Sequence, residues 1–220
     1  MNAIEKEKAQ KMIVQNLKGI ESATKTAVTE KNASLAKIKD LTMNGTRDYS
    51  PEYVEKEIVK VKADLQAKMT MANTDIAKRL EELRTLLHDR DAVLDLSNPA
   101  LTNALSLIQT IGSALKFEEA QKINANFLHD QSSLRAFRAA YLSRGVVSPG
   151  NIDALIYNAD QTIDNLKELA FQGFVQDGSV NFFATKLDIL ARLEGTSVEK
   201  IPDEQGAMDA IRRSAGLPVN

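Results

Sequence analysis

Cysteine and tryptophan are absent from the 220 residues of this sequence, and no long apolar run is present either. Without cysteine the chain forms no disulfide and offers no thiolate for catalysis or metal binding. A membrane-spanning helix needs about 20 consecutive apolar residues, and no run approaches that length, so we expect no membrane partner. The first eight residues lack the apolar stretch of a secretion signal, which predicts a cytoplasmic protein.

An excess of charge of either sign is also missing. The chain has 28 basic and 30 acidic residues, so its net charge is −2. A balance this close to zero does not predict binding to nucleic acid or to an acidic membrane surface. The apolar fraction of 43% and the charged fraction of 26% are typical of a globular chain, long enough to bury a core.

Catalytic motifs are absent as well. The two histidines each precede an aspartate, at 88–89 and 129–130, but a histidine–aspartate metal site needs more ligands than these supply. Three acids lie close together at Asp89, Asp91 and Asp95. They lack the glycine and the distal glutamate of a calcium loop. No phosphate-binding glycine loop or nucleophile motif occurs. We therefore expect no enzyme, no catalytic or metal-binding residue and no cofactor.

Residues 131–144 and 152–159 are two predicted helical segments joined by a turn, which is the arrangement of a helix-turn-helix motif. A DNA-reading helix needs outward basic and amide side chains, whereas residues 152–160 contain two acids and no base. We therefore expect no nucleic-acid partner.

The strongest pattern that is present is an apolar stripe between Pro51 and Leu94. Its residues are spaced four, three and four apart and repeat every eleven positions. Such residues share one face of an α-helix, and an eleven-residue repeat keeps that face nearly parallel to the helix axis. The pattern predicts one long helix that presents a narrow seam to another helix. The seam comprises Val54, Ile58, Val61, Leu65, Met69, Ala72, Ile76, Leu80, Leu83 and Leu87.

A second long helix is predicted to precede it. An apolar stripe, weak in its middle, runs from Asn2 to Leu41, and Asn44-Gly45 provides a helix stop. Ser50-Pro51 then provides an N-cap and a first helical residue. A short connection favours an antiparallel, coiled-coil-like hairpin over residues 1–95. The alternative is that the seam associates between chains and makes a homo-oligomer; the sequence leaves both open.

A compositional change near residues 95–99 predicts a domain boundary. All seven phenylalanines and eight of the ten glycines lie beyond it, as expected for a globular core rather than a narrow seam. Shorter helices are predicted at 98–115, 117–128, 130–144, 152–171 and 180–193. The fold class is therefore all-α, a hairpin followed by a compact bundle of about five helices over residues 96–195, with no sheet.

Residues 196–220 are predicted to be a linker and a short helix over 203–215. Such a terminal helix is either frayed or a docking peptide. Its candidate docking residues are Met208, Ile211, Arg212 and Arg213.

The segment from Leu105 to Gly145 carries a resemblance to a known group of proteins. Its core is Asp130-Gln131, Leu134-Arg135-Ala136 and Ala140-Tyr141, ending in Gly145. It resembles helical proteins from the head and structural genes of tailed phages and prophages of Gram-positive bacteria. The resemblance covers about a fifth of the chain, contains no catalytic residue, and implies a role in virion assembly or structure.

Three functions follow as alternatives. The favoured one is a phage-type structural or scaffold-like assembly protein that acts by helix-mediated association with itself or a capsid-like partner, in the host cytoplasm and in association with virions. The second is a soluble helical module that regulates or inhibits a host protein. The third, an enzyme using the two histidine–aspartate pairs, is the least favoured.

Overall fold

A computed structural model describes residues 3–92, 94–147, 149–173, 179–199 and 201. In these ranges it has eight α-helices, two short 3-10 helices and no strand, which confirms the all-α class. The α-helices are α1 (Ala3–Asp48), α2 (Pro51–Asp91), α3 (Pro99–Ile111), α4 (Phe117–Ala125), α5 (Gln131–Ser143), α6 (Ile152–Leu155), α7 (Ala159–Gly173) and α8 (Ser179–Leu193), and the 3-10 helices are η1 (Gly112–Ala114) and η2 (Pro149–Asn151).

The chain forms two compact units that do not follow chain order. Unit 1 comprises Met1–Leu17, Glu82–Asp164 and Asp188–Ser197. Unit 2 comprises Lys18–Glu81, Asn165–Leu187 and Val198–Asn220. The four longest helices contribute residues to both units, so this grouping cuts across the boundary near residues 95–99. The division at 95 and 195 stays a prediction.

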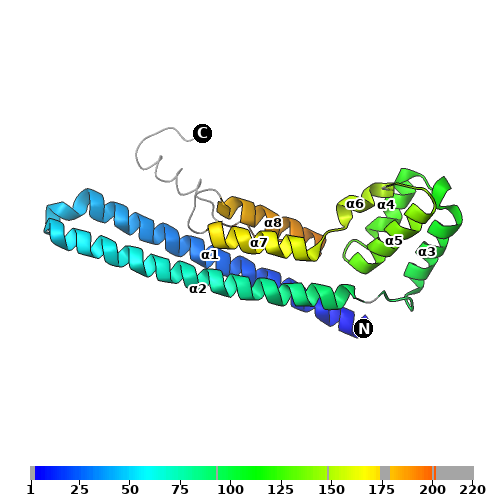
Figure 1. The fold of residues 1–220 in the computed structure, drawn as a ribbon, viewed down its shortest axis with the longest axis horizontal. Coiled ribbons are helices and arrows are strands. Elements are labelled where there is room, and N and C mark those ends of the chain that lie inside the picture. Colours follow the sequence, from blue (N-terminus) through cyan, green and yellow to red (C-terminus); the bar gives the residue numbers. More distant parts are fainter. Residues whose placement is uncertain (1–2, 93, 148, 174–178, 200, 202–220) are drawn as a thin grey trace. The chain divides into compact units, whose positions relative to one another are not determined.

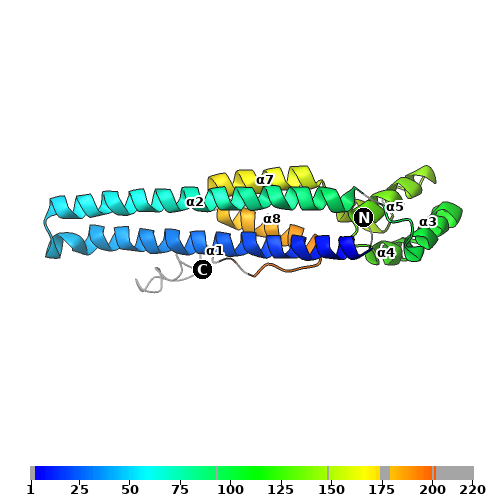
Figure 2. The ribbon, with the colours of Figure 1, turned by 90° about the horizontal axis from the view of Figure 1, so that it is seen from below.

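In unit 2, α1 and α2 lie side by side and run in opposite directions (Figures 1 and 2). Three contacts set their register: Glu30 with Lys68, Gly19 with Arg79, and Gly45 with Val54. The two members of each pair lie almost equally far along the chain from Tyr49, as antiparallel pairing around a link at Tyr49–Ser50 requires.

The predicted start of α2 is confirmed, whereas the predicted end of the first helix is wrong. The Ser50 hydroxyl accepts a hydrogen bond from the Tyr53 amide at 3.3 Å, so it caps the helix that begins at Pro51. The preceding helix α1 does not stop at Asn44-Gly45 but continues to Asp48. Gly45 is buried there, and a Cβ atom would lie 3.0 Å from Val54 Cγ2. This glycine therefore permits close packing of the two helices.

The core of unit 2 also includes residues of α7 and α8, which lie beside the α1–α2 pair (Figures 1 and 2). The Lys167 amino group of α7 lies 3.6 Å from the Glu81 carboxylate of α2. The buried apolar residues of this unit are Ile20, Ala27, Val28, Val54, Val61, Met69, Ile76, Leu80, Leu166, Ala170, Val180, Phe183, Leu187 and Ile201.

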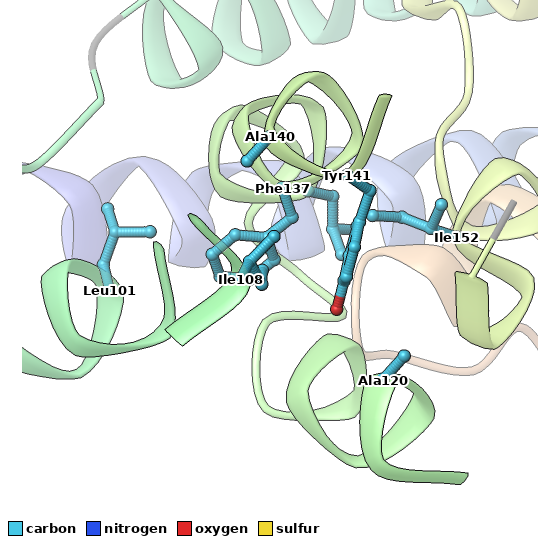
Figure 3. Packing of buried hydrophobic residues seen from close by; sticks show 8 residues of the cluster. Leu101, Ile108, Ala120, Phe137, Ala140, Tyr141 and Ile152 are labelled. Carbon is cyan, nitrogen blue, oxygen red and sulfur yellow. The ribbon is translucent and has the colours of Figure 1, made fainter. Parts of the chain in front are cut away.

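In unit 1, helices α3 to α6 surround an aromatic and aliphatic cluster (Figure 3). The Phe127 ring packs edge-on against Phe137, with ring centres 4.9 Å apart. The predicted start of α3 is confirmed, because the Asn98 side chain accepts a hydrogen bond from the Ala100 amide. The buried cluster is Leu101, Ile108, Ala120, Leu134, Phe137, Ala140, Tyr141 and Ile152.

The single helix predicted for residues 152–171 is wrong. Helix α6 ends at Leu155 and α7 begins at Ala159. The fully buried Gln131 bridges the break: its side-chain amide donates to the Leu155 carbonyl at 2.9 Å, and its carbonyl accepts from the Tyr157 amide at 3.3 Å. Backbone groups released by the break are thereby paired.

Candidate functional site

The seam residues of α2 lie largely inside the single chain. Ile58, Leu65 and Ala72 are partly exposed, and the others are buried. This burial favours the interior of one chain over an open surface between chains, the two alternatives that the sequence left undecided. Association through the seam itself stays a prediction. The buried members are Val54, Val61, Met69, Ile76 and Leu80 in unit 2, and Leu83 and Leu87 in unit 1.

The part of the α1–α2 pair nearest the link is poorly covered. We call residues 32–68 the distal pair; all of them are described, and three are buried, namely Gly45, Val54 and Val61. At the tip, the Tyr49 and Tyr53 rings lie 5.0 Å apart. The large apolar or aromatic side chains that the distal pair exposes are Leu35, Met43, Tyr49, Tyr53 and Val59.

One of these exposed residues shares a face of α2 with a residue that contacts α7. Val59, Thr70 and Glu81 are eleven residues apart, so they share one face of α2. At Glu81 this face contacts α7, because the Glu81 carboxylate forms an ion pair with Lys167 of that helix. At Val59, which is 61% exposed, the same face meets solvent.

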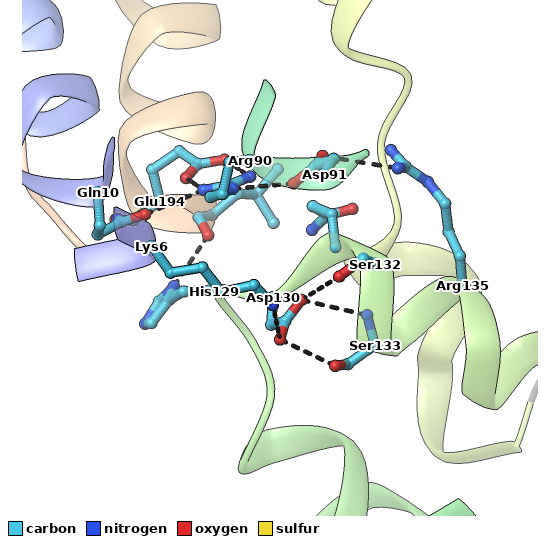
Figure 4. Close-up of polar contacts among 12 residues, drawn as sticks. Lys6, Gln10, Arg90, Asp91, His129, Asp130, Ser132, Ser133, Arg135 and Glu194 are labelled. Carbon is cyan, nitrogen blue, oxygen red and sulfur yellow. Dashed lines mark hydrogen bonds and ion pairs between the residues drawn. The ribbon is translucent and has the colours of Figure 1, made fainter. Parts of the chain in front are cut away.

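A buried polar network lies in unit 1 (Figure 4). The Arg90 guanidinium forms an ion pair with the Glu194 carboxylate, and both side chains are almost completely buried. Arg90 also donates to Gln10 Oε1 at 3.0 Å and to Asp91 Oδ1 at 2.8 Å. The Tyr157 hydroxyl donates to the same Glu194 carboxylate. The network joins α1, α2, the residue that follows α8, and the segment between α6 and α7.

The pKa shifts in this network keep Arg90 charged and Tyr157 neutral. Burial lowers the pKa of Arg90, but the hydrogen bond and the charge of Glu194 outweigh it and raise that pKa above its usual value. Burial and the adjacent Glu194 charge raise the pKa of Tyr157, so its hydroxyl keeps its proton. A fully paired arginine, a glutamate acceptor and a neutral tyrosine hold helices together and provide no activated nucleophile.

A cleft of about 730 Å³ lies beside this network in unit 1. Its charged walls are paired: His88 Nε2 lies 2.9 Å from Asp160, and Arg138 Nε lies 2.5 Å from Asp153. The hydrogen bond from His88 lowers the pKa of Asp160. Across the described part of the chain, no group of three or more histidine or acidic side chains could hold a metal ion.

The two histidines have separate partners. His88 contacts Asp160, and His129 Nδ1 donates to the Leu193 carbonyl at 2.9 Å. The structure therefore assigns neither histidine to the aspartate that follows it in the sequence. The candidate docking residues Met208, Ile211, Arg212 and Arg213 lie outside the described residues.

Asp130 caps α5 with a charged side chain. Its carboxylate accepts hydrogen bonds from the Ser133 amide at 3.2 Å and from the Ser132 and Ser133 hydroxyls at 2.6 and 2.8 Å. Burial raises the pKa of Asp130, but these hydrogen bonds outweigh it, and the pKa lies below its usual value.

We expect Asp130→Ala to cost about 1–2 kcal/mol of unfolding free energy at neutral pH, as loss of a helix cap does. Because the pKa is lowered on folding, the charged cap stabilises above the unfolded pKa of about 4 and loses this effect as pH falls through the folded pKa. Urea unfolding at pH 7 and pH 3 measures the difference. Asn98→Ala removes a neutral cap, so its cost should not change with pH; equal pH dependence of both variants would contradict the assignment.

No known protein family, curated protein or solved structure matches this chain. None of the described helices combines the length and the apolar character needed to cross a membrane.

Proposed function

We propose that the protein acts by helix-mediated association, as a phage-type virion structural or assembly protein. In this proposal α1 and α2 are a coiled-coil-like hairpin, the shorter helices of unit 1 form a bundle, and the distal pair binds a second copy of the chain. The observation that carries it is the exposure of the distal pair: Ile58 and Leu65 are partly exposed, whereas the seam residues eleven positions further along α2, Met69 and Ile76, are buried.

Energetics support a partner for the distal pair. A helix gains most of its stability from packing of its apolar face rather than from intrinsic propensity. The partly exposed Ile58 and Leu65 and the exposed Leu35 and Val59 leave much of that packing unmade. Burial of one such side chain stabilises by about 1.5–3 kcal/mol, so a few of them suffice for a specific contact.

Charge supports a second copy as the partner. Residues 32–68 contain seven basic and six acidic side chains. Two such surfaces do not repel each other, and acids of one copy can lie opposite bases of the other. The phage-type setting comes from the resemblance of residues 105–145, whose implied assembly role agrees with a protein that works by contact.

The test is a charge placed on the exposed face of the distal pair. Val59→Lys should weaken self-association at least about tenfold, a loss of about 1.4 kcal/mol, because a lysine replaces a buried contact. Since Val59 is 61% exposed in the single chain, circular dichroism should show unchanged helicity. Light scattering over a concentration series measures the association constant.

Ala67→Lys is the matched control. Ala67 is exposed and lies eight residues after Val59, about 80° further around α2. Ala67 faces away from the seam, and its replacement by lysine adds the same charge to the same helix. We expect this variant to associate like the unchanged chain. If Val59→Lys and Ala67→Lys weaken association equally, or neither does, the proposed surface is wrong.

A further inference from the structure

The antiparallel register of α1 and α2 divides the distal pair into two halves along its length. Glu30 pairs with Lys68, so residues of the two helices that are equally distant from Tyr49 lie at the same level. We call residues 40–58 the tip half, and residues 32–39 and 59–67 the base half. At a rise of about 1.5 Å per residue, each half is about 12–14 Å long. Lys68 already has a partner in Glu30 and is counted in neither half.

The two halves carry charge of opposite sign. The tip half contains five acidic and two basic side chains, whereas the base half contains one acidic and four basic side chains. The net charge is therefore −3 in the tip half and +3 in the base half. The centres of the halves lie about 13 Å apart, which exceeds the Debye length of about 8 Å at physiological salt. A second molecule therefore meets two separate fields rather than one neutral surface.

These charges are not paired within their own chain. Among the residues that the structure describes, no charged side chain of either half forms an ion pair. All of these side chains are exposed except that of Glu57, which is partly exposed. Both halves are therefore open to charges of a partner.

Charge distinguishes two orientations of a second copy. In a parallel arrangement the two tip halves face each other, as do the two base halves, and like charges in contact oppose binding. In an antiparallel arrangement each tip half faces a base half. On the basis of the proposed function, in which the distal pair binds a second copy, we propose that the two copies run antiparallel, with the tip half of each on the base half of the other. This arrangement has a two-fold axis, so it closes with two identical contacts.

The position of Val59 fits this symmetry. Val59 lies at the boundary between the two halves, so in the antiparallel arrangement it lies near the two-fold axis and faces its counterpart. Glu55 lies four residues before Val59 and Lys62 three residues after it. These spacings place both side chains on the same side of Val59, about 40° and 60° around α2. The two-fold axis then brings Glu55 of each copy opposite Lys62 of the other.

The test exchanges these two charges. Glu55→Lys and Lys62→Glu should each weaken self-association about tenfold, because each dimer then contains two repulsive contacts in place of two attractive ones. The double variant restores opposite charges across the contact, and its association constant should return to within about twofold of that of the unchanged chain. In parallel copies Glu55 faces Glu55 and Lys62 faces Lys62, so neither the loss nor the recovery would occur. Sedimentation equilibrium measures the association constants.

Asp64→Lys is the matched control. It makes the same change of charge as Glu55→Lys, at another exposed position of α2. Asp64 lies five residues after Val59, about 140° around the helix. This variant should not weaken association. A loss equal to that of Glu55→Lys would overturn the proposed pairing, because the effect would then come from net charge alone.

Salt gives a second readout on the unchanged chain. Between about 0.05 M and about 0.5 M sodium chloride, association should weaken, because screening reduces attraction between opposite halves. Association that strengthens with salt overturns the proposal, since like halves would then face each other. A double variant without recovery also overturns it, and if Val59→Lys still weakens association, the proposed function stands. A chain that stays a monomer at every concentration overturns both.

Discussion

Arg90→Ala is expected to lower the free energy of unfolding by about 3–5 kcal/mol, because it leaves the Glu194 carboxylate buried without its cation. Glu194 is 1% exposed and keeps one strong donor, the Tyr157 hydroxyl, when the guanidinium is removed. Urea or thermal unfolding followed by circular dichroism measures the loss.

Two variants separate this buried pair from an ordinary ion pair. Arg90→Met combined with Glu194→Leu removes both charges and should recover most of the stability. Arg138→Ala breaks an exposed pair with Asp153 and should cost less than about 1 kcal/mol. An Arg90→Ala loss no larger than that of Arg138→Ala would contradict the assignment of a buried, charge-paired network.

Ile76→Asp is expected to cost at least about 3 kcal/mol, because it removes a buried side chain and places a charge in the core of unit 2. Ile76 is fully buried within one chain. The loss should therefore be the same at every protein concentration, whereas an interface between chains would make it concentration-dependent.

Leu65→Asp is the comparison on the same seam. Leu65 is partly exposed, so its carboxylate can remain hydrated and the fold should lose much less stability. Its main effect should be on self-association. If both aspartates cost equally little, Ile76 faces solvent and the packing of α2 described above is wrong.

The long helices could be predicted because their information is local. The eleven-residue spacing of Val54, Leu65 and Ile76 predicts one continuous face, and Ser50-Pro51 predicts where α2 begins. The end of α1 could not be predicted in the same way. Gly45 is a stop signal by itself, but its role in the fold depends on Val54 of the facing helix.

The break between α6 and α7 and the buried ion pair both depend on contacts between residues that are far apart in the sequence. The chain leaves helical geometry after Leu155 where Gln131 supplies the replacement hydrogen bonds. Arg90 and Glu194 are 104 residues apart, and no spacing rule links them. The network around Arg90 therefore could not be predicted from the sequence, where the neighbouring Asp91 stands out only as one of three acids close together.

The exposed surface of the distal pair also could not be predicted from the sequence. The apolar stripe predicts which residues face another helix, but it does not predict how many further helices cover that face. Helices α7 and α8 contribute buried residues to the core of unit 2, whereas Val59 and Leu35 of the distal pair are exposed. Only the three-dimensional arrangement separates the seam residues that stabilise the fold from the exposed residues that can bind a partner.

We propose that this protein works by binding through the exposed part of the α1–α2 pair. Sedimentation equilibrium of the unchanged chain, from low to high micromolar concentration, distinguishes an associating protein from a monomer. We expect an average mass that rises reversibly with concentration from one chain toward two or more. A single-chain mass at every concentration would show that the exposed helix pair does not bind a second copy.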